Sequence, residues 1–248
     1  IYLPLLGTNP KTFDLEPAIA TAIPDIRSVN NGGVALDYEI SQDAVWCDNV
    51  PITTKDVLFT LKMIFLPEMD NPWRSYFNLV DSLIISEDSP NKFTFLLSEP
   101  YILAIPATAS LQPYPQHLID PEGKIDAFSL QEIRNLDSLP ANLESIHSWF
   151  VSDSMSRYNI CGAGPYSLEK WNSNQYLKLD AIEDHWTKKA GMQSTITQAN
   201  PKQINYLVIP EEANAIAQLK NGNIDIMNII LTFKKNNMNI LIGCVETI

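Results

Sequence analysis

Three histidines invite a catalytic interpretation, because imidazole takes up and releases protons near neutral pH. They stand at His117, His147 and His185. His117 lies in a proline-rich stretch, where it could act as a general base if a carboxylate or nucleophile lay beside it. No such partner is spaced to use it, and the chain has neither an H-E-x-x-H nor a G-x-S-x-G motif. We therefore interpret His117 as a hydrogen-bonded turn residue and predict that the protein is not an enzyme.

The three cysteines lack the spacing of a metal site. Cys47, Cys161 and Cys244 lie far apart and form no C-x-x-C pair. The simplest interpretation is that they are small buried apolar residues. The alternative is a disulfide, which would fit an oxidising compartment. We expect no metal and no cofactor.

The glycine pair at Gly162 and Gly164 could suggest a phosphate-binding loop. A phosphate loop, however, is followed by a helix and by a Lys-Ser/Thr pair. Here Pro165 and Tyr166 follow, and the pattern beyond them is that of a strand. The glycines therefore predict a sharply bent connection.

Composition excludes several classes of function. The chain has 248 residues, of which 45% are hydrophobic, so it can bury a core in one large or two modest domains. A net charge of -12 and a pI near 4.6 argue against nucleic-acid binding, which needs clustered Lys and Arg. No apolar run approaches the roughly 20 residues of a membrane span, and no signal sequence precedes Ile1. We expect any export signal to have been removed or never included.

Among the elements that must position these residues, the stretch Trp46–Pro67 has the clearest sequence signals for local structure, namely a turn followed by a helix with a defined start and end. Asn49 tolerates the left-handed backbone of a tight turn. Thr53 and Asp56 have the spacing of a capping box, so a helix is predicted to begin at Thr54. Apolar residues then recur at helical spacing, and the closing proline ends the helix.

The rest of the chain alternates between strand and helix patterns. Alternation of apolar and polar residues predicts strands, and turn residues separate them. The predicted strands are 34–40, 83–85, 93–97, 166–170, 176–181, 203–209 and 224–226; the predicted helical regions are 126–155, broken by Pro140, and a helix starting at 210–212 and ending at Asn221-Gly222.

Three motifs, in this order, resemble those of the peptide- and oligopeptide-binding class of solute-binding proteins of ABC importers, family 5. W-C-D-N-V-P-I-T-T-K-D-V at 46–57 resembles W-S-D-G-x-P-[VIL]-T-A-x-D-V, with departures at Cys47, Asn49 and Thr54 that the turn can absorb. G-A-G-P-Y at 162–166 resembles G-[TS]-G-P-[YF]. The segment 209–226 resembles a third motif that begins I-P-[DE] and ends I-D-[IV].

The resemblance implies a mixed α/β fold, namely one lobe of a periplasmic-binding-protein-like type II clamp. We expect a main subdomain from residues 1–40 plus 161–230 and an inserted α+β subdomain at 41–160. The segment 231–248 matches no motif, and the second lobe is expected to be absent from this chain. An insertion leaves and rejoins its host at adjacent points, so the resemblance also brings Cys47 and Cys161 close enough for the disulfide alternative.

The function that the resemblance implies is capture of a short peptide, which is then delivered to an ABC permease in the membrane. Such a protein would be monomeric and periplasmic or at the cell surface, with a lipid anchor attached through a removed N-terminal signal. By analogy, the first-lobe ligand contacts would be Tyr2, Tyr76, Ser110, Gly162 and Gly164, although purely structural roles are the alternative for each of them.

Two other functions remain open on the sequence alone. One is a truncated or degenerate stand-alone interaction domain without transport, because half a clamp cannot close by hinge motion. The other is binding of a different cargo, such as an oligosaccharide or a metal complex. No sequence feature separates these cargoes.

Overall fold

The computed structural model describes residues 1–30, 32–69, 71–152, 157–228 and 242–246. The strands are β1 (Leu6–Thr8), β2 (Leu15–Pro17), β3 (Asp25–Ser28), β4 (Val34–Glu39), β5 (Val80–Ile85), β6 (Lys92–Leu97), β7 (Tyr166–Asn172), β8 (Tyr176–Ala181), β9 (Gln203–Val208), β10 (Ile226–Asn228) and β11 (Ile242–Glu246). The α-helices are α1 (Thr54–Phe65), α2 (Ala104–Ala109), α3 (Gln116–Ile119), α4 (Leu130–Arg134), α5 (Glu144–Val151), α6 (Trp186–Lys189) and α7 (Glu212–Lys220). Short 3₁₀ helices are η1 (Pro72–Phe77), η2 (Lys124–Ala127), η3 (Ala141–Leu143) and η5 (Thr195–Thr197). Within the described residues, no helix has the length and apolar character needed to span a bilayer.

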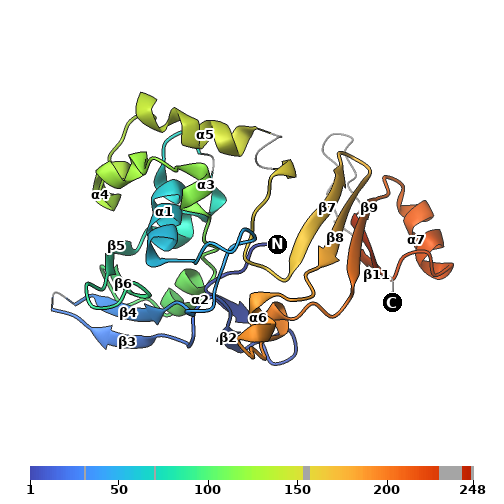
Figure 1. The fold of residues 1–248 in the computed structure, drawn as a ribbon, viewed down its shortest axis with the longest axis horizontal. Coiled ribbons are helices and arrows are strands. Elements are labelled where there is room, and N and C mark those ends of the chain that lie inside the picture. Colours follow the sequence, from blue (N-terminus) through green and yellow to red (C-terminus); the bar gives the residue numbers. More distant parts are fainter. Residues whose placement is uncertain (31, 70, 153–156, 229–241, 247–248) are drawn as a thin grey trace.

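A four-stranded antiparallel sheet of order β3-β4-β6-β5 forms one half of the molecule (Figure 1). Its central strand β4 is the predicted alternating strand, with Val34, Leu36 and Tyr38 buried. Leu36 lies opposite Phe95 of β6, so both side chains point to the same face. Helices α1 and α4 contact β5 of this sheet, and α3 and α5 lie on the same side, near α1 (Figure 1).

Helix α1 begins and ends where the sequence predicts. Asn49 adopts a left-handed φ of 66° in the turn before it. The backbone N–H of Thr53 donates to the Asp56 carboxylate at 2.8 Å, and the Thr53 hydroxyl donates to the same oxygen at 3.0 Å. At the other end, the Arg74 guanidinium donates to the carbonyl of Phe65 at 2.7 Å. The predicted cap and the predicted stop are therefore confirmed.

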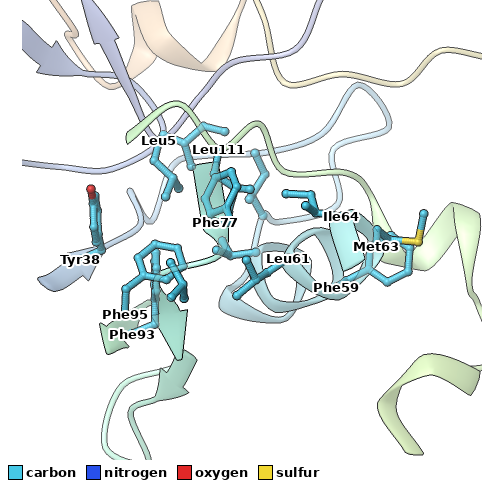
Figure 2. Close-up of a cluster of buried hydrophobic side chains, with 14 of the residues drawn as sticks. Leu5, Tyr38, Phe59, Leu61, Met63, Ile64, Phe77, Phe93, Phe95 and Leu111 are labelled. Carbon is cyan, nitrogen blue, oxygen red and sulfur yellow. The ribbon is translucent and has the colours of Figure 1, made fainter. Parts of the chain in front are cut away.

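The main core lies between α1 and the four-stranded sheet. Figure 2 shows Leu61 and Ile64 of α1 pointing toward Phe77, with Phe95 approaching from the sheet. Leu111 closes the same cluster, and all five residues are buried. Each such side chain contributes about 1.5–3 kcal/mol through removal of apolar surface from water.

A second, five-stranded sheet of order β10-β11-β9-β8-β7 forms the other half, with α7 on one side of it (Figure 1). A small separate core joins helix and sheet through Ile209, Ala215 and Ile224. The strand predicted at 224–226 begins later, at Ile226. The reason is that the turn after α7 continues past Gly222, whose φ is 71°, and the Asn223 N–H donates to the Gln218 carbonyl at 2.9 Å.

Strand pairing crosses the expected subdomain boundary at residue 40. Strands β3 and β4 precede that residue, yet both belong to the sheet that contains β5 and β6. Strand β11, from the segment expected to match no motif, pairs with β9 and β10. The division into 1–40 plus 161–230 and 41–160 remains a prediction, and the pairing favours an insertion that starts before β3.

Candidate functional site

The N-terminal segment places several of the predicted site residues. It runs extended, and the Leu5 N–H donates to the Leu111 carbonyl at 2.9 Å. The Tyr2 ring packs against Tyr114 with 5.0 Å between centroids. Farther back, the Gly164 N–H donates to the Ile1 carbonyl at 2.6 Å. The segment is thus held between the chain around Leu111 and the glycine turn.

Gly162 and Gly164 allow this close backbone approach. A Cβ at Gly162 would lie 2.3 Å from the Ile1 carbonyl oxygen, and one at Gly164 would lie 2.5 Å from the same atom. Both glycines are buried. The structure therefore gives them a packing role, and their contact with a ligand remains a prediction.

A disulfide joins Cys47 and Cys161, with Cα atoms 5.2 Å apart and 114 residues apart in sequence. Cys47 belongs to the turn before α1, and Cys161 directly precedes the glycine turn. The bond thus connects the two ends of the long excursion that contains β5, β6 and α1 to α5.

The best candidate for a ligand site is a groove along η1 that consists of three pockets with shared lining residues, here called the Trp73 groove. Its first part, the α5 pocket, measures about 440 Å³ and lies between α1 and α5. Its last part, the α2 pocket, measures about 470 Å³ and lies between η1 and α2. A small pocket of about 60 Å³ lies between them, and Trp73 lines all three.

Local sequence explains why Trp73 stands in the groove. The Asn71 side chain accepts from the Trp73 N–H at 2.9 Å, and Pro72 occupies the first turn of η1, where no backbone donor is needed. Phe77 is buried at the other end of η1, so the turn is fixed at both ends. Trp73 and Tyr76 consequently project outward, with 47% and 57% of their surfaces exposed.

The groove is aromatic and nearly uncharged. Among the described residues that line it, Glu68 is the single carboxylate, and none is Lys or Arg. Burial raises the pKa of the Tyr114 phenol in the middle of the groove. Burial, with the neighbouring Tyr114, raises the pKa of Tyr2 as well. Both phenols are therefore neutral at physiological pH.

The structure brings together some of the predicted ligand contacts. Tyr76 and Ser110 both line the α2 pocket. Tyr2 is not among the residues that line the groove, but its ring packs against Tyr114, which lines two of the pockets. Gly162 and Gly164 are not among the residues that line it. The sequence interpretation missed Tyr114 and Tyr101, whose isolated positions give no periodic signal.

His117 has the carboxylate partner that the sequence did not reveal. Its Nε2 lies 2.7 Å from an Asp48 carboxylate oxygen, and the two residues are 69 positions apart. The expectation that no carboxylate is placed beside it was therefore wrong. Burial would raise the pKa of Asp48, but hydrogen bonds from His117 and from the Val50 N–H outweigh it and lower that pKa. The pair ties α3 to the turn before α1.

His185 is a packing residue. One ring nitrogen lies 3.0 Å from the Ala163 carbonyl and the other 2.8 Å from the Thr187 hydroxyl. Burial lowers the pKa of His185 to about 4, so its imidazole is neutral at physiological pH. His185 thus packs against the glycine turn, and the Trp186 indole N–H also donates to the Ala163 carbonyl, at 2.9 Å.

Comparison with known proteins gives the family. The model for "Bacterial extracellular solute-binding proteins, family 5 Middle" matches residues 14–238. The match extends past the third motif, which ends at residue 226, into the segment 231–248 that was expected not to match. The oligopeptide-binding protein AppA of Bacillus subtilis is 23% identical over 97% of this chain and 38% of its own length. The chain therefore spans well under half of that relative.

Solved structures have the same fold. AppA in complex with a nonapeptide superposes with a TM-score of 0.64 at 21% identity, over 90% of this chain and 37% of AppA. An oligopeptide-binding protein of Thermus thermophilus with a pentapeptide has a TM-score of 0.62 at 19% identity, over 90% of this chain and 38% of its own. A periplasmic oligopeptide-binding protein of Thermotoga maritima with bound mannohexaose has a TM-score of 0.61 at 18% identity, over 90% of this chain and 34% of its own.

These relatives are solute-binding proteins and not enzymes, in keeping with a chain whose motifs predict binding and no catalysis. The coverage agrees with the expectation of a single lobe, and the mixed α/β fold is the predicted one. This chain belongs to family 5 of the bacterial extracellular solute-binding proteins.

Proposed function

We propose that this protein binds short extended peptides in the Trp73 groove and presents them, outside the cytoplasm, to an ABC importer. The observation that carries the proposal is the groove itself. Its aromatic walls offer large apolar contacts to varied side chains, as expected of a site that tolerates many sequences. The hydroxyls of Tyr76 and Ser110 supply polar groups for a peptide backbone.

The disulfide supports location outside the cytoplasm. Disulfides persist in oxidising compartments and are rare in the cytosol. The family is extracellular by its description, which supports a periplasmic or surface location. Lipid anchoring and a monomeric state are parts of the same proposal.

Capture by a clamp requires a second lobe. In hinge closure, two domains approach each other around the ligand. This chain spans 38% of AppA, so the peptide affinity of the chain alone reflects one wall of the site. We therefore expect weak but measurable binding by the 248 residues and tighter binding by any longer product of the gene.

Thermal unfolding with a peptide library tests the proposal. A ligand that binds only the native state at 100 times its Kd stabilises it by about 2.7 kcal/mol, which raises the Tm. We expect a dose-dependent increase with peptides. The Trp73→Ala/Tyr76→Ala variant should lose it, whereas Tyr158→Ala, which removes an exposed aromatic residue outside the groove, should keep it.

Mannohexaose serves as the competing cargo, because a fold relative holds it. A Tm increase with mannohexaose and none with any peptide would overturn the peptide proposal. An equal increase in the double variant and in the unchanged protein would place the site elsewhere.

A further inference from the structure

The two large pockets of the Trp73 groove differ in charge. The α2 pocket is lined by neutral residues, among them Tyr101 and Leu103. The α5 pocket contains the Glu68 carboxylate and the His147 imidazole beside apolar walls. The groove is therefore apolar at one end and acidic at the other.

Glu68 is placed at the α5 pocket by an unusual backbone conformation. Its φ is 66°, in the left-handed region that glycine adopts without strain and that few other residues occupy. The residue directly follows Pro67, which ends the segment after α1. One carboxylate oxygen accepts from the Leu139 N–H at a long 3.3 Å. The side chain is exposed, so the carboxylate retains acceptor capacity toward the pocket.

Aromatic rings form the walls around this carboxylate. The rings of Tyr114 and Phe150 meet edge to face with 5.2 Å between centroids, and Trp73 lines the same pocket. A planar cation binds well to such a combination, because it stacks on aromatic faces and donates paired hydrogen bonds to a carboxylate. Guanidinium meets both requirements, whereas a lysine ammonium offers no flat face.

We propose that the α5 pocket is a specificity pocket for an arginine side chain of the bound peptide, with an apolar side chain of the same peptide in the α2 pocket. This inference rests on the proposed function. Because Trp73 lines both pockets, the two side chains come from nearby peptide positions, and positions i and i+2 of an extended chain share a face. Charge complementarity agrees, since no Lys or Arg lines the groove in the described part of the chain and the net charge is -12.

Calorimetry with two matched pentapeptides tests this inference. Both carry leucine at position 2; one has arginine at position 4 and the other has citrulline, which keeps the shape and loses the charge. We expect the arginine peptide to bind roughly tenfold more tightly, as a charge-assisted hydrogen bond predicts. Glu68→Gln should bring the two affinities to within about twofold of each other, because the amide keeps the size of the side chain without its charge.

Glu87→Gln is the matched control, since Glu87 is exposed in the turn between β5 and β6 and lines none of the three pockets of the groove. It should keep the full preference for arginine. Equal affinity of the unchanged protein for both peptides, while other peptides of the library bind, would overturn the arginine pocket and leave the proposed function standing. Binding of no peptide at all would overturn both.

Discussion

At the scale of single residues, burial and long-range contacts decide what each polar side chain does. His117 looked partnerless in the sequence because Asp48, its partner, lies 69 positions away. His185 is held by the Ala163 carbonyl, a contact that depends on how the glycine turn folds. Residue types were readable from the sequence, but these pairings were not, because they exist only after distant segments pack.

The buried His185 predicts an acid-sensitive contribution to stability. Its folded pKa of about 4 lies below the unfolded value of 6.5, so in that window the unfolded chain binds more protons. The free energy of unfolding should therefore fall as pH decreases from about 6.5 to 4, by about 3 kcal/mol for this group.

Urea denaturation from pH 7 to pH 4 measures this effect. The variant His185→Gln should show a smaller loss over the same range, although it starts from a lower stability. The pKa values of Asp37 and Asp48 are lowered, so their contributions to stability are lost at still lower pH. They therefore do not account for a loss of stability above pH 4. Parallel curves for the two proteins would contradict the assignment.

At the scale of elements, local signals were sufficient for α1 and insufficient for the sheets. The cap at Thr53, the apolar stripe and Pro67 are all close in sequence, so the helix could be predicted from residue to residue. The sheet to which β4 belongs could not be predicted in this way, because its partner β6 lies beyond α1 and the aromatic turn. The groove was equally hidden, since residues of α1, η1, α2 and α5 must meet before it exists.

Thr53 predicts a measurable cap effect. Thr53→Ala removes the hydroxyl that donates to Asp56 at 3.0 Å, and loss of an N-cap side chain costs about 1 kcal/mol of stability. Thr53→Ser retains the hydroxyl and should stay within a few tenths of a kcal/mol of the parent protein. Equilibrium unfolding in urea compares the three. Equal stability of the alanine and parent proteins would show that the Thr53 backbone N–H, which also donates to Asp56, is sufficient for the cap.

At the scale of the whole molecule, several contacts join the chain before Cys161 to the chain that follows it. One is the disulfide beside the glycine turn. Another is made by the Glu16 carboxylate of β2, which accepts from the Ser194 hydroxyl at 2.8 Å and from the Thr195 N–H at 2.6 Å. Burial alone would raise the pKa of Glu16, but these hydrogen bonds outweigh burial and lower that pKa. Figure 1 shows β2 beside α6; Ser194 and Thr195 follow that helix, at the start of η5.

Removal of the disulfide should destabilise the protein substantially. A bond that closes a loop of 114 residues restricts the unfolded chain, and the chain-entropy model gives about 4–5 kcal/mol as its upper contribution. We expect Cys47→Ser/Cys161→Ser to lower the free energy of unfolding by roughly 2–5 kcal/mol. Urea denaturation of this variant and of the oxidised parent measures the difference, and Cys244→Ser, which leaves Cys47 and Cys161 in place, serves as the control for a cysteine-to-serine substitution. A change below 1 kcal/mol would show that the glycine turn holds the junction without the bond.

The ring closed by Cys47 and Cys161 also sets an order of events on the proposed route out of the cell. A chain drawn through a narrow secretion channel passes as a single open thread, and a loop of 114 residues with its ends already joined would be a doubled strand. On this proposed route, passage precedes oxidation, and the bond between Cys47 and Cys161 closes only after the chain has left the cytoplasm.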